Sequence, residues 1–136
     1  MFGFEYYSPT KVIFGKGTEN QAGELVKAYG AKKVLIHYGG KSAVKSGLID
    51  RLKASLDAAG VAHVELGGVV PNPHLSKVRE GIALGKKEGI DFILAVGGGS
   101  TIDSSKAISY GLAEPEKDVW ELFEKKRTAQ KFLPIA

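Results

Sequence analysis

The chain has 136 residues, of which 43% are hydrophobic, which is enough for one buried core but not for two well-separated domains. Its 19 basic and 15 acidic residues are interleaved and give a net charge of +4. The chain therefore lacks the large region of positive charge that would indicate binding to nucleic acid. The absence of cysteine excludes a disulfide framework and a thiolate metal site. Neither a signal-peptide pattern nor an apolar run near the roughly 20 residues of a membrane span is present, so we expect a cytoplasmic domain.

The first third of the chain predicts a hairpin, a helix and a strand. Residues 2–7 and 11–14 are rich in aromatic and β-branched side chains and flank a Ser-Pro-Thr turn, which is typical of a short β-hairpin. A helix follows, with Thr18 as its expected cap and Gly30 at its end. Residues 33–38 then predict a strand that runs directly into the next turn.

The middle of the chain continues the alternation. Residues 48–59 predict a helix, and residues 61–66 predict a strand near a sheet edge because apolar and polar side chains alternate in it. After a loop with two prolines, a helix begins near Leu75 and ends near Gly89. The wholly apolar residues 92–96 predict a central strand, since both of its faces must be covered.

The last stretch predicts one more helix and one more strand. Asp118 is a candidate helix cap, with Trp120 and Phe123 spaced for one helix face. Residues 132–136 are typical of a strand that stops with no turn or polar tail. We therefore expect the chain to be a fragment of something longer.

This order of elements predicts an α/β fold: a Rossmann-like parallel sheet with helices on both faces, preceded by an amino-terminal β-hairpin. Ligands of such sheets bind at the carboxyl ends of the strands. Three turns follow predicted strands, at Gly39 and Gly40, at residues 71–73, and at residues 97–99. We expect these turns to meet at one rim of the sheet.

The glycines at 97–99 suit an anion, because they let backbone N–H groups and a helix start approach a phosphate. An ordinary tight turn is the alternative. Gly40, Lys41 and Ser42 supply the second half of a Walker A loop, but Leu35 occupies the place of its first glycine. The Gly-x-Gly-x-x-Gly fingerprint also fails, because Ile102 replaces its third glycine.

A different pattern does match. Residues 97–106 (Gly-Gly-Gly-Ser-Thr-Ile-Asp-Ser-Ser-Lys), 70–73 (Val-Pro-Asn-Pro) and 11–15 (Lys-Val-Ile-Phe-Gly) occur together in this chain. Their combination resembles the iron-dependent alcohol dehydrogenase family, and residues 38–42 (Tyr-Gly-Gly-Lys-Ser) are similar to its butanol dehydrogenase branch. The resemblance covers the whole chain in the family's order.

The resemblance implies that residues 1–136 form a dinucleotide-binding domain. Gly98, Gly99 and Ser100 would hold the pyrophosphate, and Thr101 lies in the same motif. Asp103 would support the loop or the ribose, although a helix-start carboxylate with no ligand explains it equally well. Asn72 would face the nicotinamide. In the family a helical domain follows and holds a divalent metal, iron or zinc, through one aspartate and three histidines.

Position 39 predicts the choice of cofactor. Family members that use NAD carry an aspartate there for the ribose hydroxyls, whereas this chain has Gly39 followed by Gly40, Lys41 and Ser42. A glycine removes the charge that would repel a 2′-phosphate, and the lysine and serine offer a cation and a hydroxyl. The sequence therefore predicts NADP(H), with a plain turn and an exposed lysine as the alternative.

We expect no metal site within these residues. The three histidines, His37, His63 and His74, lie on different segments without the spacing of helix-borne ligands. Ser100 lacks a Gly-x-Ser-x-Gly context, which disfavours a hydrolase.

The predicted role is to place NADP(H) in a homodimeric enzyme acting on a small alcohol or aldehyde, with this chain alone inactive. A relative of glycerol dehydrogenase or dehydroquinate synthase remains an alternative. So does a nucleotide-binding module without chemistry.

Overall fold

The fold is a parallel sheet between two layers of helices. A computed structural model of the chain describes residues 3, 5, 9–71, 74–116, 118–123 and 131–136. The strands lie in the order β2-β1-β3, and all pairs are parallel. Their bounds are β1 (Lys33–Tyr38), β2 (Ala62–Leu66) and β3 (Phe92–Val96). The prediction of an α/β fold with a parallel sheet is confirmed.

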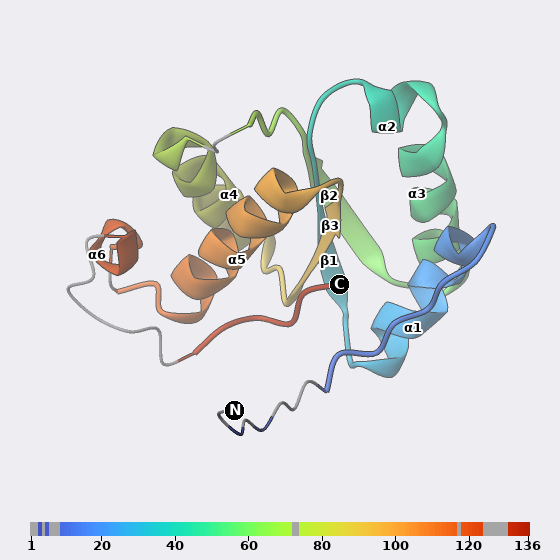
Figure 1. The fold of residues 1–136 in the computed structure, drawn as a ribbon, viewed down its shortest axis with the longest axis horizontal. Coiled ribbons are helices and arrows are strands. Elements are labelled where there is room, and N and C mark those ends of the chain that lie inside the picture. Colours follow the sequence, from blue (N-terminus) through green and yellow to red (C-terminus); the bar gives the residue numbers. More distant parts are fainter. Residues whose placement is uncertain (1–2, 4, 6–8, 72–73, 117, 124–130) are drawn as a thin grey trace.

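Helices cover both faces of this sheet (Figure 1). One layer holds α1 (Ala22–Ala28) and α3 (Leu48–Ala58), and the other holds α4 (Leu75–Glu88) and α5 (Gly99–Ala113). Val34 and Ile36 of β1 point into the first layer, whereas Leu35 points into the second. Because both faces are covered, β1 is apolar at successive positions, as period-two geometry requires. The short elements are η1 (Thr18–Gln21), α2 (Ser42–Lys45) and α6 (Trp120–Phe123).

The strand β2 lies at one edge of the sheet, and the carboxyl-terminal residues lie beside β3 at the other. The strand β2 pairs only with β1 among the named strands, as its alternating pattern predicted. On the far side of β3, Ile135 forms a parallel bridge with Ile93. The Ala95 N–H donates to the Ala136 carbonyl at 2.8 Å. The apolar strand β3 therefore has neighbours on both sides, and part of the predicted last strand is present.

Glycines let α4 and α5 approach closely. At three places in this contact, a Cβ added to a glycine would lie within 2.6 Å of an aliphatic side chain on the facing helix. These pairs are Gly81 with Ile108, Gly85 with Leu112, and Gly111 with Ile82. The interlocking fixes α5 along its length, and so fixes where its first turn lies.

The structure differs from two local predictions and adds one short helix that was not predicted. Residues 11–14 form no strand, and Phe14 is 99% exposed; much of the other predicted arm lies outside the described residues, so the hairpin is not confirmed. Thr18 is no side-chain cap, because Gly17 holds that position and the Thr18 hydroxyl donates to the Gly15 carbonyl at 3.0 Å. The helix α2 was not predicted, since four residues carry no helical periodicity.

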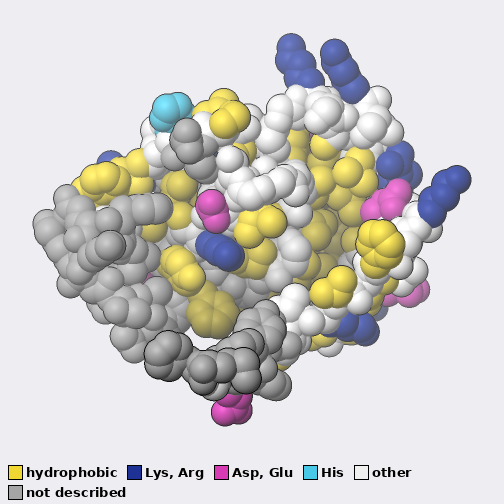
Figure 2. Space-filling model, viewed as in Figure 1, with side chains coloured by type: hydrophobic (Ala, Val, Ile, Leu, Met, Phe, Trp, Pro, Cys, Tyr) yellow, Lys and Arg dark blue, Asp and Glu magenta, His cyan; other side chains and the backbone are white. Residues whose placement is uncertain are grey.

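Other surface features agree with the sequence. The Asp118 carboxylate accepts a hydrogen bond from the Trp120 N–H at 3.3 Å, as expected of a cap. On the face in Figure 2, basic side chains are scattered among acidic and hydrophobic ones. Of the helices in the described part of the chain, none has the length and apolar character needed to cross a membrane.

Candidate functional site

An open cleft of about 490 Å³ lies where β1 and β3 end. Gly39, Gly40 and Ser42 line it after β1, and Gly97, Gly98 and Thr101 line it after β3. The remaining lining residues are Ala43, Ser46, Leu48 and Val96. Two turns that are far apart in sequence thus meet at one rim, because the strands are parallel neighbours.

The other candidate residues either do not line this cleft or lie outside the described chain. Lys41 is exposed at the N-cap position of α2, and Asp103 is exposed on α5. Ser100 is half-buried, one residue after Gly99. Asn72 lies outside the described residues, so its predicted contact with the nicotinamide stays a prediction.

The three consecutive glycines after β3 meet different surroundings. Gly97 has φ 152°, and a Cβ there would lie 2.6 Å from Thr101 Oγ1, so the turn itself needs this glycine. A Cβ on Gly98 or Gly99 would meet nothing within 4 Å, and Gly40 across the cleft is equally open. Packing within the chain therefore does not explain these glycines, whereas a ligand pressed against the backbone would.

The start of α5 offers free hydrogen-bond donors to such a ligand. Gly98 is its N-cap and no side chain caps the helix, and the Ile102 N–H is the first to find a helical acceptor, at Gly98 O, 3.1 Å away. The preceding N–H groups have no partner in the helix. Together with the positive dipole end of a 15-residue helix, they attract an anion. The buried Thr101 adds a hydroxyl to the same wall.

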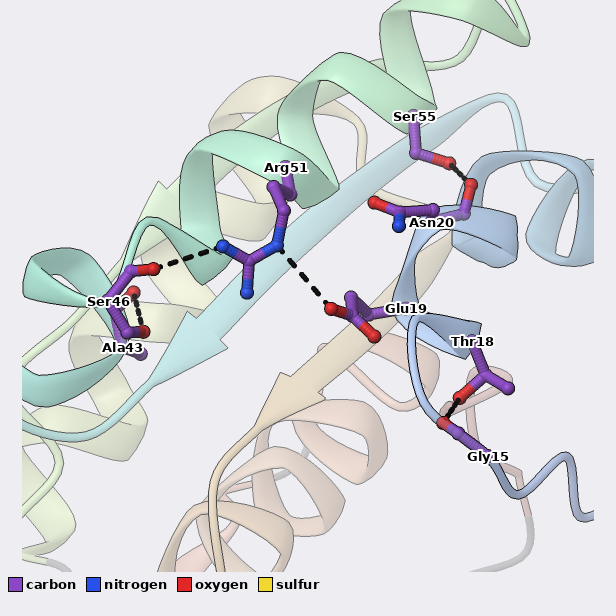
Figure 3. Close-up of polar contacts among 8 residues, drawn as sticks. All are labelled: Gly15, Thr18, Glu19, Asn20, Ala43, Ser46, Arg51 and Ser55. Carbon is purple, nitrogen blue, oxygen red and sulfur yellow. Dashed lines mark hydrogen bonds and ion pairs between the residues drawn. The ribbon is translucent and has the colours of Figure 1, made fainter.

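Arg51 braces the opposite wall (Figure 3). Its Nη1–H donates to the Ser46 carbonyl at 3.0 Å, and its Nε lies 3.4 Å from Glu19 Oε1. The Ser46 hydroxyl in turn donates to the Ala43 carbonyl at 3.2 Å. These contacts tie the loop beside the cleft to α3 and η1. The sequence does not predict the contact between Arg51 and Ser46, because its acceptor is a backbone carbonyl group, which every residue has.

His37 lies behind the cleft and is fully buried. Its Nδ1 is 2.8 Å from the Leu66 carbonyl oxygen and its Nε2 is 2.8 Å from Ser104 Oγ. Burial lowers its pKa below the ordinary value, so the ring is neutral near pH 7. The sequence predicted only that His37 binds no metal, and gave no sign of this pair of contacts.

The remaining histidines have other surroundings. His63 Nε2 lies 2.8 Å from Asp57 Oδ1, and His74 occupies the N-cap position of α4 without a side-chain cap bond. No group of three or more His, Asp or Glu that could hold a metal ion occurs among the residues the structure describes.

The buried His37 makes stability depend on pH. In the unfolded chain this side chain titrates near 6.5, and in the folded chain its pKa is lower. Burial is the largest influence on this pKa and lowers it, the hydrogen bond with the Leu66 carbonyl raises it, and the charges of Lys77 and Glu80 act in opposite directions. The free energy of unfolding therefore loses nothing to His37 above pH 6.5. Below that pH it falls as the side chain takes up a proton on unfolding, by up to about 1.4 kcal/mol per pH unit.

Urea unfolding at several pH values between 7.5 and 5 measures this slope. In His37→Gln, which has no imidazole at this position, the slope below pH 6.5 should largely disappear. An equal slope in both proteins would contradict the assignment to His37.

A parallel α/β sheet with a glycine turn leading into a helix is typical of nucleotide-binding domains. The chain belongs to the iron-containing alcohol dehydrogenase family, whose family model matches residues 9–136. The resemblance predicted from the glycine motif is thereby confirmed.

The similar proteins are much longer than this chain. A probable NADH-dependent butanol dehydrogenase of Bacillus subtilis is 48% identical over 135 residues, which is 99% of this chain and 34% of the relative. An NADPH-dependent aldehyde reductase of Escherichia coli is 35% identical over 125 residues, 91% of this chain and 31% of the relative.

The crystal structure of an NADH-dependent butanol dehydrogenase from Thermotoga maritima superposes with a TM-score of 0.93 at 46% identity, over 98% of this chain and 33% of that one. The chain therefore spans about a third of the length of these relatives.

Proposed function

We propose that this chain is the cofactor-binding domain of an NADP(H)-dependent alcohol dehydrogenase or aldehyde reductase. The observation that carries the proposal is the cleft between the Gly39 turn and the Gly97 turn, with uncapped N–H groups at one wall. A dinucleotide has phosphates for that wall and an adenosine ribose for the other. Family membership and the names of the relatives support a nicotinamide nucleotide.

In this proposal, different parts of the cofactor contact the two walls of the cleft. The N–H groups of Gly99 and Ser100 bind the pyrophosphate, which lies against the bare backbone of Gly98. Thr101 contributes its hydroxyl, and Asp103 supports the ribose or the loop. Asn72 faces the nicotinamide.

The whole protein is proposed to move hydride between the nicotinamide and a small primary alcohol or aldehyde. When bound, a divalent metal would supply Lewis-acid polarisation of the substrate oxygen, and we propose that residues of the whole protein other than these would hold it. This chain orients the nicotinamide for that transfer and is inactive alone, in keeping with its third of the relatives' length. The whole protein is proposed to be a cytoplasmic homodimer.

The first wall of the cleft, formed by the turn after β1 at Gly39, supports a preference for NADP(H). Gly39 presents no carboxylate to a 2′-phosphate, Ser42 lines the cleft, and Lys41 is an exposed cation beside it. A charge-assisted hydrogen bond contributes about 1.5–3 kcal/mol, so one such contact favours NADP(H) about tenfold or more. The relative that is 48% identical carries an NADH-dependent name and the one that is 35% identical an NADPH-dependent name, so the names do not favour NADP(H) and the ratio of the two affinities is the informative measurement.

Calorimetric titration of the chain with NADPH and NADH tests both parts of the proposal. We expect both to bind, and NADPH to bind about tenfold more tightly. Equal affinity, or tighter binding of NADH, would contradict the preference. Failure of both to bind would contradict the function itself.

Gly39→Asp should reverse the preference. A Cβ at position 39 would lie 3.4 Å from the Val69 carbonyl oxygen and 3.7 Å from Thr101 Oγ1, so a side chain fits. The new carboxylate repels a 2′-phosphate and accepts hydrogen bonds from ribose hydroxyls, so NADPH affinity should fall about tenfold while NADH affinity is kept or rises.

Gly39→Asn is the matched control, with the same shape and no charge. If Gly39→Asn weakens NADPH binding as much as Gly39→Asp does, size rather than charge governs this position.

A further inference from the structure

The buried His37 connects the two walls of the cleft. A carbonyl oxygen can only accept, so the contact of Nδ1 with the Leu66 carbonyl places the ring proton on Nδ1. In the neutral ring Nε2 is then an acceptor, and the Ser104 hydroxyl donates to it at 2.8 Å. Both side chains are buried, with exposed fractions of 0% for His37 and 1% for Ser104.

These contacts join three elements at the same end of the sheet. His37 is the next to last residue of β1, two residues before Gly39. Leu66 is the last residue of β2. Ser104 lies on α5, five residues after Gly99, so the helix carries any movement of Ser104 to the glycine turn. One imidazole thus links the strand that ends in the first wall to the helix that forms the second.

We propose that His37 is a positioning residue for the dinucleotide site, which fixes the start of α5 relative to the turn after β1 and so sets the spacing of the two walls. The identity of the ligand in this inference rests on the proposed function, whereas the link between β1 and α5 is present in the chain without any ligand.

The physical reason is preorganisation. Separating His37 from Ser104 leaves a buried donor and a buried acceptor without partners, which is unfavourable, so the link stays closed. A dinucleotide that touches both walls binds more tightly when their spacing is already fixed, because less ordering accompanies binding.

A matched pair of substitutions separates positioning from general stability. His37→Gln places its amide near the position of Nε2 and keeps a partner for Ser104. His37→Asn places its amide near Nδ1, which keeps the Leu66 contact and loses the link to α5. Each variant loses one of two similar hydrogen bonds, 2.8 Å long in both cases, so their losses of stability should be similar.

Titration with NADPH then distinguishes the variants. His37→Asn and Ser104→Ala should weaken NADPH binding about three- to tenfold, whereas His37→Gln should stay within about twofold of the unsubstituted chain. Equal weakening in the Asn and Gln variants would overturn the proposal, as would normal binding by Ser104→Ala.

Amide hydrogen exchange provides a second measurement that needs no ligand. In His37→Asn, protection should fall at residues 102–106 in the first half of α5 and remain at residues 110–113, whereas His37→Gln should retain both. A uniform loss along α5 would overturn the proposal. If the unsubstituted chain binds no nicotinamide nucleotide, the proposed function fails, and exchange still decides whether His37 fixes α5.

Discussion

Gly23→Ala should lower the free energy of unfolding by about 3 kcal/mol, the upper end of the range for overpacking. A Cβ at this position would lie 2.0 Å from the Ser55 carbonyl oxygen and 2.9 Å from the Leu56 nitrogen. Both are backbone atoms of α3, so no side-chain rotation relieves the overlap. The Gly23 N–H also donates to Ser55 Oγ at 2.9 Å, and moving α1 away lengthens that bond.

Urea unfolding monitored by circular dichroism measures this change. Alanine is intrinsically better than glycine in a helix by about 1 kcal/mol, so the sign of the effect shows which factor is larger. Gly99→Ala is a suitable control, since it also lies in a helix and its Cβ would meet nothing within 4 Å. A loss at Gly23 no larger than at Gly99 would contradict the close crossing of α1 and α3.

The strands and the meeting of the turns follow from local pattern. A strand covered on both faces must be apolar throughout, which is why residues 92–96 predicted β3 with its observed bounds. The helix before it ends where Gly89 adopts φ 68°, a conformation that glycine favours. Once the strands are parallel, the turns after Tyr38 and Val96 must lie at one edge.

The contacts that shape the cleft could not be predicted in this way. The link from His37 to Ser104 spans 67 positions, and neither residue stands out from an ordinary core or helix residue in sequence. Arg51 binds a backbone carbonyl, and carbonyl acceptors occur at every residue. The amino-terminal pattern shows the opposite error, because residues 11–14 have strand-like side chains but form no strand. Propensity alone does not supply a partner for a strand.

Within the glycine turn, alanine substitutions should separate ligand binding from folding. Gly98→Ala and Gly99→Ala should leave the unfolding transition nearly unchanged and weaken NADPH binding about five- to a hundred-and-fiftyfold. Gly98 has φ −97° and ψ −159°, which any residue can adopt, and both Cβ positions are open in the free chain. When pyrophosphate lies against this backbone, the added methyl group overlaps it, and overpacking of about 1–3 kcal/mol corresponds to that loss of affinity.

Gly97→Ala should behave in the opposite way. The added Cβ would lie 2.6 Å from Thr101 Oγ1, and φ 152° is unfavourable for alanine, so the unfolding temperature should fall whether or not a cofactor is present. Thermal unfolding and NADPH titration of the three variants give the comparison. If Gly98→Ala and Gly99→Ala bind NADPH normally, the pyrophosphate does not lie against this turn. Of the three glycines, only Gly97 would then be explained, by the turn itself, and the cleft would have to hold its ligand through the wall at Gly39 and Ser42.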